Sequence, residues 1–596
     1  MRINLPFFGA KKEKVCLFGV NTENLFIAKS AEKANLLFYG SATAADKAAL
    51  RTWRMPLSPL SSELGARDIL ARAAKGKGIF TVILNTQNEE ENLRLATLFA
   101  EGIFALADKA KVELYTRLSV FLFSDADEEY ADLVQKAYGC LRVFRPHRAV
   151  AEDFTAEHPL ARHLDARHVD YRTSFLHERT DLRVFFIGFD EVAAAIYQNS
   201  VANDRFFAAS PTGAEPRAVS YHIYDPRAEE KMRSFSEGCL RYRIRRPALA
   251  SENCLPLPPL PSEDAFFTVD LTSAALRELL TQNILHGEQD ACFAIVSAGS
   301  DEENAALAQF VLSWKNAIGA QLTVFVRQRN ASQEAADLAE AGCILFGAAE
   351  DIYRLDTVKG GTLTKMAMMR NEIYNFEYAV THMRVAPTAT NMEENRRRSE
   401  RDWYLSTTEL NRRSSRYGCL SIRSKLNLMG LDCLPAEECK GEALSEEEYL
   451  AIYAAGDPLS VRGEINGKKI LRYTLDFPPS RRRFFAEQEH DRWNAFMFVN
   501  GYIPATCEEI LNSTADKNGK TVHTNGKDTA QQKHGNLTTF EGLVEYRRMI
   551  AERDGVSEES ADVIKYDYQL MDDAYWLLSK NGYAIVYLHR PTEQNG

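Results

Sequence analysis

An internal duplication is the feature of this chain that most constrains its fold. A short apolar run ending in glycine occurs twice, at 15–19 and at 184–188, and each run precedes a stretch that can be helical. Two further landmarks recur in the same order: an apolar run before an acidic helix start, and an apolar run that leads through a helical pattern to Gly-Cys. Apolar runs that alternate with helical patterns predict a parallel α/β sheet in each copy.

The change of pattern along the chain predicts its domains. The fold class we expect is α/β, with two tandem Rossmann-like parallel-sheet domains followed by a mostly α-helical domain. The predicted boundaries are 13–158 for the first sheet domain, 159–180 for a connector, 181–355 for the second sheet domain, 356–480 for a helical and mixed region, and 481–593 for the C-terminal domain.

Composition excludes several classes of protein. The net charge of −11 argues against binding to duplex nucleic acid, which favours a basic surface. The ten cysteines are widely spaced without a CxxC pair, which is typical of a reducing compartment. No apolar run approaches the ~18 residues of a membrane span. At the N-terminus a short apolar patch comes before the lysines, which is the reverse of the order in a signal peptide. We therefore expect a cytoplasmic protein without a membrane span.

The glycine turns differ from a dinucleotide-binding fingerprint, in which a second glycine lets the backbone approach the pyrophosphate. Only the first glycine is present in each copy, at Gly19 and Gly188, and Asp190 brings a carboxylate to the expected phosphate position. One interpretation is that Asp190 caps the helix and the fold is kept without a phosphate site. The other is that an altered site still binds a nucleotide.

The second copy retains an acid where a ribose would bind. Its strand-like run 219–224 ends at Asp225, which can accept hydrogen bonds from a ribose diol, whereas the first copy has no acid there. Together with Ile187-Gly188-Phe189 and the segment Ser297 to Asn304, this layout resembles the nucleotide-binding half of bacterial potassium-conductance regulator (RCK, or Trk-type) subunits. The resemblance implies that the segment carrying Ser297, Gly299 and Asp301 lies beside an adenosine, and that the chain forms a homodimer.

The C-terminal domain carries an ordered set of motifs. Glu489-His490-Asp491-Arg492-Trp493 lies in a helical pattern, Gly501-Tyr502 follows it, and Lys533-His534, Lys565-Tyr566-Asp567 and Gly582-Tyr583 come later. The set resembles the ryanodine-receptor repeat. It departs from that family's pattern at two places: the turn reads Gly501-Tyr502-Ile503-Pro504, and Lys533 and His534 are adjacent. The resemblance implies an adenine-nucleotide ligand and a role in a signalling or anti-phage system.

The roles of these aromatic residues remain open at this level. Trp493 or Trp576 can stack on a base, an interaction worth ~1–3 kcal/mol. In the alternative interpretation Trp493 is a core residue of the repeat, and His490 forms a hydrogen bond nearby.

A histidine-rich segment invites a metal hypothesis. It contains His158, His163, Asp165, His168 and Asp170. On a helix, positions 163 and 168 would lie about 140° apart, which is poor for two ligands of one ion, so we predict no metal. No Gly-x-Ser-x-Gly elbow or P-loop is present. We therefore predict no catalytic residues and favour a protein that is not an enzyme.

Three functional hypotheses follow. The first is a nucleotide-sensing signalling or anti-phage-defence protein, with NAD, ADP-ribose, ATP or a cyclic oligonucleotide as the candidate ligand and a protein partner in the same system. The second is a non-catalytic scaffold or a cytoplasmic regulator of a channel or partner. The third, an NAD-dependent oxidoreductase, is less favoured because both phosphate turns are altered. The candidate binding residues are Gly188, Asp190, Asp225, Ser297, Gly299, Asp301, His490, Trp493, Tyr502 and Trp576.

Overall fold

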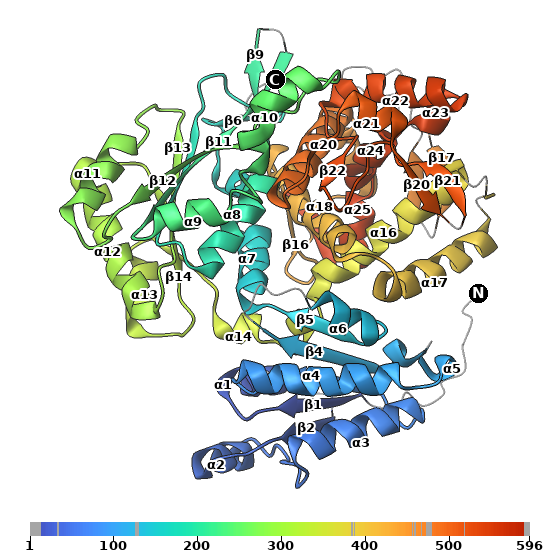
Figure 1. Ribbon diagram of the computed structural model, residues 1–596. Coiled ribbons are helices and arrows are strands. Elements are labelled where there is room, and N and C mark those ends of the chain that lie inside the picture. Colours follow the sequence, from blue (N-terminus) through green and yellow to red (C-terminus); the bar gives the residue numbers. More distant parts are fainter. Residues whose placement is uncertain are drawn as a thin grey trace. The chain divides into compact units, whose positions relative to one another are not determined.

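The computed structural model describes two compact units (Figure 1). One comprises Met1–Val150, Gly347–Gly361 and Glu400–Thr408, and the other Ala151–Phe346, Thr362–Ser399 and Glu409–Gly596. The described residues are 13–588, apart from 32–34, 112, 125–129, 212, 383–384, 387, 456, 458–460, 466–467, 472–479 and 518.

The first unit is built on a five-stranded parallel sheet with the order β2-β1-β3-β4-β5. Its strands are short apolar runs, and β3 is buried throughout, as expected for a sheet covered on both faces. Helices α3 and α4 lie side by side along this sheet (Figure 1). The strands are β1 (Lys14–Phe18), β2 (Asn35–Tyr39), β3 (Phe80–Leu84), β4 (Leu118–Phe123) and β5 (Leu141–Phe144), and the main helices are α1 (Thr22–Ser30), α2 (Ala44–Thr52), α3 (Ser62–Ala74) and α4 (Glu89–Phe104).

The second unit contains a six-stranded parallel sheet with the order β12-β11-β8-β13-β14-β15. Numbered from its own first strand, this is the order 3-2-1-4-5-6 of a Rossmann fold. The prediction of two Rossmann-like parallel sheets is therefore confirmed. The strands are β8 (Leu182–Ile187), β11 (Val219–Asp225), β12 (Ser262–Thr268), β13 (Ala291–Val296), β14 (Thr323–Arg327) and β15 (Ile344–Phe346), and the helices between them are α8 (Glu191–Asn203), α9 (Ala228–Ser234), α10 (Arg241–Glu252), α11 (Ala274–Asn283), α12 (Asp301–Ile318) and α13 (Gln333–Glu340).

The two sheets differ by one strand. The first sheet has counterparts of β8, β11, β13, β14 and β15 in the same spatial order, but none of β12. In the first unit α2 and α3 connect the matching strands, whereas α9, α10, β12 and α11 do so in the second. The extra strand and its flanking helices, together with a hairpin between α8 and β11, account for the wider spacing between the sequence landmarks of the second copy.

A small mixed sheet, in which β7 and β9 are parallel and the other two pairs are antiparallel, precedes and interrupts the second parallel sheet. Its order is β10-β9-β7-β6, with β6 (Val169–Asp170) and β7 (Phe175–Leu176) in the predicted connector. The hairpin of β9 (Phe206–Ser210) and β10 (Gly213–Arg217) lies between α8 and β11 along the chain.

The remainder of the second unit is mostly helical, as predicted. Helix α20 (Arg481–Val499) is buried along nearly its whole length because α8, α18 and α24 all pack against it. In the described part of the chain, no helix combines the length and apolar character needed to cross a membrane. The other helices are α16 (Gly361–His382), α18 (Glu409–Leu428), α19 (Glu446–Tyr453), α21 (Cys507–Asn512), α22 (Phe540–Asp554), α24 (Lys565–Asp572) and α25 (Ala574–Lys580), and α17 (Ala389–Leu405) belongs to this unit up to Ser399.

Candidate functional site

The turn after β8 is closed by Gly188. Its φ is +78°, and a Cβ at this position would lie 2.5 Å from Ala298 Cα, so only glycine fits. The Gly188 N–H donates to Tyr224 O (3.0 Å), and the Ser297 N–H donates to Ile187 O (3.1 Å). The ends of β8, β11 and β13 therefore meet at the point where the strand order reverses, which is where open α/β sheets bind ligands.

Asp190 occupies the anion position at the N-terminus of α8. Its Oδ1 accepts hydrogen bonds from the Ala193 N–H (2.9 Å) and from Ser297 Oγ (2.8 Å). Its Oδ2 forms an ion pair of 2.5 Å with Arg327, the last residue of β14. A helix N-terminus favours a negative charge, and here the chain itself supplies both that charge and a cation for it.

Asp225 ends β11 and is also paired. Its carboxylate accepts hydrogen bonds from the Phe189 N–H (3.0 Å) and the Arg227 N–H (2.8 Å), and it forms an ion pair of 2.7 Å with Lys231 Nζ. Lys231 also donates to Phe189 O. Asp225 is thus joined to the Gly188 turn through Phe189, as a ribose-binding acid should be, but it already has a cationic partner.

The segment after β13 forms the start of α12. Asp301, its first residue, accepts hydrogen bonds from the backbone N–H groups of Arg329 (2.8 Å) and Asn330 (3.0 Å). Gly299 lies two residues earlier, where a Cβ would overlap the Glu303 carboxylate. The structure therefore brings Gly188, Asp190 and Ser297 into one cluster, and it places Gly299 and Asp301 on the adjoining turn.

Two cations of this cluster, Arg327 and Lys231, were not predicted from the sequence. Arg327 lies 137 residues from Asp190 along the chain, so no local pattern signals the pair. Lys231 lies six residues after Asp225, on α9, and a basic residue at this spacing after a strand-ending acid is the one available signal.

The first sheet has an amide, Asn21, at the position that Asp190 takes in the second. Asn21 caps α1, and its Nδ2 donates to Asn85 O (2.7 Å). Gly19 has a φ of +97°, and a Cβ there would lie 2.8 Å from Thr86 Cα. The turn geometry is therefore repeated without the charged groups.

In the C-terminal part, His490 is buried and bonded through both ring nitrogens. Nε2 lies 3.0 Å from Thr538 O, and Nδ1 lies 3.3 Å from an Asp567 carboxylate oxygen. Burial lowers the pKa of His490, but the Asp567 carboxylate and the Thr538 carbonyl outweigh burial and raise this pKa above its ordinary value.

Trp493 is half-buried between two imidazole rings. Its ring is stacked on His490 (centroids 5.9 Å apart) and meets His534 edge-on at 5.1 Å. Burial lowers the pKa of His534 to about 3, so this ring is neutral at physiological pH. Tyr502 lies in the turn after α20, and Trp576 lies on α25.

The histidine-rich segment packs into an aromatic cluster. His158 and His163 have ring centroids 5.8 Å apart, and both rings contact Phe325. His168 is held separately, with Nδ1 accepting a hydrogen bond from the Asp165 N–H (3.1 Å).

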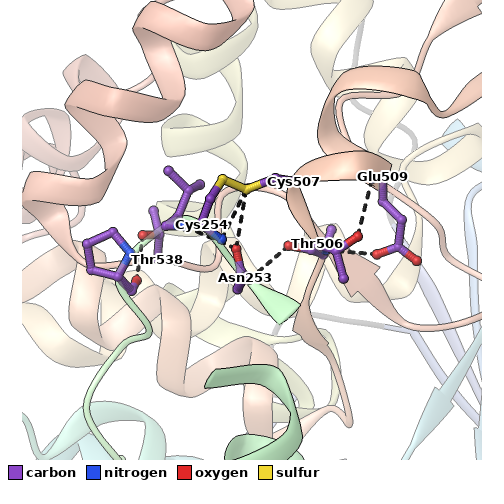
Figure 2. The surroundings of a disulfide bond; sticks show 9 residues. Asn253, Cys254, Thr506, Cys507, Glu509 and Thr538 are labelled. Atoms are coloured by element: carbon purple, nitrogen blue, oxygen red, sulfur yellow. Dashed lines mark hydrogen bonds between the residues drawn. A yellow bond between two sulfur atoms is a disulfide. The ribbon is translucent and has the colours of Figure 1, made fainter. Parts of the chain in front are cut away.

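A disulfide joins Cys254 to Cys507 across 253 residues (Figure 2). The Cα atoms lie 5.9 Å apart, within the normal range for a bridge, and the Asn253 side chain donates to Ala505 O (3.0 Å) beside it. This bridge was not predicted from the sequence. Spacing in the sequence says nothing about two residues that only the fold brings together.

No family model matches the chain, and no curated protein matches it in sequence. Among solved structures, the GsuK RCK domain aligns over 62% of this chain and 80% of its own length, with 11% identity and a TM-score of 0.32. A GsuK channel bound to NAD aligns over 63% of this chain and 66% of its own, with 11% identity and a TM-score of 0.31. A ketoreductase domain from the bacillaene assembly line aligns over 63% and 80%, with 13% identity and a TM-score of 0.15.

Proposed function

We propose that this chain is a nucleotide-sensing signalling or anti-phage-defence protein, and that its ligand binds at the carboxyl edge of the second parallel sheet. The observation that carries the proposal is the meeting of Gly188, the N-terminus of α8 and Asp225 at the switch point between β8 and β13. This is the place where the Rossmann order forms its ligand crevice.

Each group at this edge has a role that its chemistry suits. The N-terminus of α8 and Arg327 attract a phosphate, and Asp225 accepts hydrogen bonds from ribose hydroxyls. A bound nucleotide would compete with Asp190 for Arg327 and with Lys231 for Asp225. Binding would therefore exchange internal ion pairs for pairs with the ligand, which gives the site a means to change the structure around it.

Helix α20, which carries the Glu489–Trp493 motif, is placed to respond to such a change. Helix α20 packs directly against α8, and Arg205, two residues after α8, forms a buried ion pair of 2.7 Å with Asp491 of α20. Trp493 lies on the same helix and offers an aromatic ring for a base. We include His490, Trp493, Tyr502 and Trp576 in the proposal as a second candidate site, together with a homodimeric, cytoplasmic state.

The experiment has two steps. Purified protein is denatured and any released nucleotide is identified by mass spectrometry; calorimetry then measures affinities for NAD, ADP-ribose, ATP and cyclic oligonucleotides. We expect Asp225→Asn to weaken binding about tenfold, since it removes a charge-assisted hydrogen bond of about 1.5 kcal/mol. Asp270→Asn, which changes an exposed acid just beyond β12, is the matched control and should bind as the wild type does.

If Trp493→Ala loses nucleotide affinity while Asp225→Asn binds as the wild type does, the binding site lies in the C-terminal helices instead. If the wild type binds none of these nucleotides, the sensor proposal is wrong. The second hypothesis, a non-catalytic scaffold or regulator of a channel or partner, then stands, and the internal pairing of Asp190 and Asp225 favours it. An NAD-dependent oxidoreductase is less favoured because the turn keeps one glycine and carries Asp190.

A further inference from the structure

Three cations converge on one buried carboxylate inside the second unit. Glu489 of α20 is 1% exposed, and it is bonded to Arg492 (2.8 Å), to Arg370 of α16 (2.9 Å) and to Lys425 of α18 (3.2 Å). Asp567 is the next carboxylate, and it pairs with His490. Among the residues that the structure describes, three cations therefore face two carboxylates, even when Asp567 is counted and His490 is taken as neutral.

The other buried arginines of this unit are balanced. Each is matched by at least one carboxylate, in the groups Arg205 with Asp491, Arg423 with Asp432 and Glu157, Arg482 with Asp457 and Asp572, and Arg547 with Glu558 and Asp562. An unmatched buried charge is costly because it loses its hydration without gaining a counter-ion. The excess at Glu489 therefore calls for an anion from outside the chain.

Two donors at the cluster are also unsatisfied. Arg492 Nη1 and Arg370 Nη1 are buried and have no hydrogen-bond partner among the residues that the structure describes. The Arg492 side chain is only 1% exposed, so bulk water does not replace the missing partner. Arg547 Nη1 is unsatisfied as well, so the missing partner supports an anion at Glu489 only together with the excess of positive charge there.

Lys425 keeps its charge at neutral pH, so the excess of positive charge around Glu489 remains. Burial lowers the pKa of Lys425 to about 8, and the Glu489 carboxylate opposes this effect. Since this value is above 7, the ammonium form predominates at physiological pH.

The helix packing makes room for the guanidinium of Arg370. A Cβ at Gly418 of α18 would overlap Arg370 Nη1, so glycine at this position lets the arginine lie against the helix. The Arg370 side chain is 17% exposed, against 3% for Lys425. Arg370 therefore lies on the side of the cluster nearest to solvent.

We propose that Arg370, Lys425 and Arg492 form a buried anion site that binds a phosphoryl group, supplied either as free phosphate or by a nucleotide. Two planar guanidinium groups with free Nη1 donors suit the several oxygens of a phosphate better than a halide, which has no such geometry. The site shares no residue with the carboxyl edge of the second sheet, so binding at the two places can be tested separately.

The wild-type protein provides the first test. Equilibrium dialysis with radiolabelled phosphate should show saturable binding of one phosphate per chain, and phosphate should raise the Tm more than NaCl at equal ionic strength. ADP is compared with adenosine in the same assay. Binding of phosphate itself identifies free phosphate as a sufficient source, whereas binding of ADP without phosphate or adenosine identifies a nucleotide.

Variants then locate the site. We expect Arg370→Gln to weaken phosphate or ADP binding at least tenfold, whereas Arg547→Gln, which breaks a balanced cluster, lowers the Tm but keeps the binding. Asp225→Asn should also keep it, which separates this site from the proposed nucleotide site. Absence of saturable phosphate and ADP binding in the wild type overturns the proposal, as does wild-type affinity in Arg370→Gln.

Discussion

At the scale of single residues, replacing Gly188 by alanine tests how tightly the turn after β8 is packed. The positive φ and the approach of Ala298 both oppose a side chain, so we expect a loss of about 3 kcal/mol in the free energy of unfolding. Gly342 has a φ of +88° but nothing within 4 Å of an added Cβ, so Gly342→Ala should cost only about 1 kcal/mol. Urea unfolding of both variants measures the difference, and equal losses would contradict the tight packing.

The buried histidines give a prediction for pH. Burial lowers the pKa of His158 and of His163 to about 4, whereas the unfolded chain takes up protons near pH 6.5. Stability from this pair is therefore fully present above pH 6.5 and is lost as the pH falls from 6.5 towards 4. His163→Phe should reduce this loss, since phenylalanine fits the aromatic cluster and does not titrate.

The measurement is the urea midpoint at pH 7.5 and at pH 5. Phe325→Leu serves as the control, because it disturbs the same cluster without removing a titrating group and should leave the pH dependence in place. An unchanged pH dependence in His163→Phe would show that this histidine does not take part.

Several residue-level features could be predicted from the sequence because they are local. The glycine at the end of an apolar run and the acid two residues later are enough to predict the turn and the Asp190 cap. The cations that pair with Asp190 and Asp225 could not be predicted, because ion pairing depends on which strand ends become neighbours. The excess of positive charge around Glu489 could not be predicted either, since it depends on the packing of α16, α18 and α20.

At the scale of elements, the disulfide ties the proline-rich segment after α10 to the N-terminal end of α21. Closing a long loop is expected to stabilise the folded chain by about 2–4 kcal/mol. Cys254→Ser should therefore lower the Tm, and a reductant should lower the Tm of the wild type but not of this variant. Cys439→Ser, at a cysteine outside the disulfide, is the control that should behave as the wild type.

Thermal unfolding with and without reductant provides this comparison, and mass spectrometry under non-reducing conditions checks the bridge itself. A wild-type Tm that does not respond to the reductant, with free thiols at both positions, would contradict the disulfide.

The duplication shows how far element-level prediction reaches. The matched runs correctly predict two parallel sheets because buried strands alternate with helices at recognisable spacing. They do not reveal that β12 is inserted in the second copy alone, because β12 is amphipathic and partly exposed, unlike the fully buried β13. The strand order 3-2-1-4-5-6 depends on that inserted strand.

At the scale of the whole molecule, the C-terminal helices belong to the same compact unit as the second parallel sheet. Helix α20 is buried on all sides because α8, α18 and α24 surround it, although its sequence has the charged character of a surface helix. Its charges are accommodated by pairs such as Arg205 with Asp491, which link segments 286 residues apart. The carboxyl edge of the second sheet, where α8 begins, therefore lies one helix away from the Glu489–Trp493 motif of α20.

Hydrogen exchange of backbone amides tests the central claim, nucleotide binding at the second sheet, most directly. Exchange is measured with and without the nucleotide that binds in calorimetry. We predict slower exchange at residues 188–193 and 225–231 and no change at residues 19–24, the matching turn of the first sheet. Slower exchange at 19–24, or none at 188–193 and 225–231, would contradict the account.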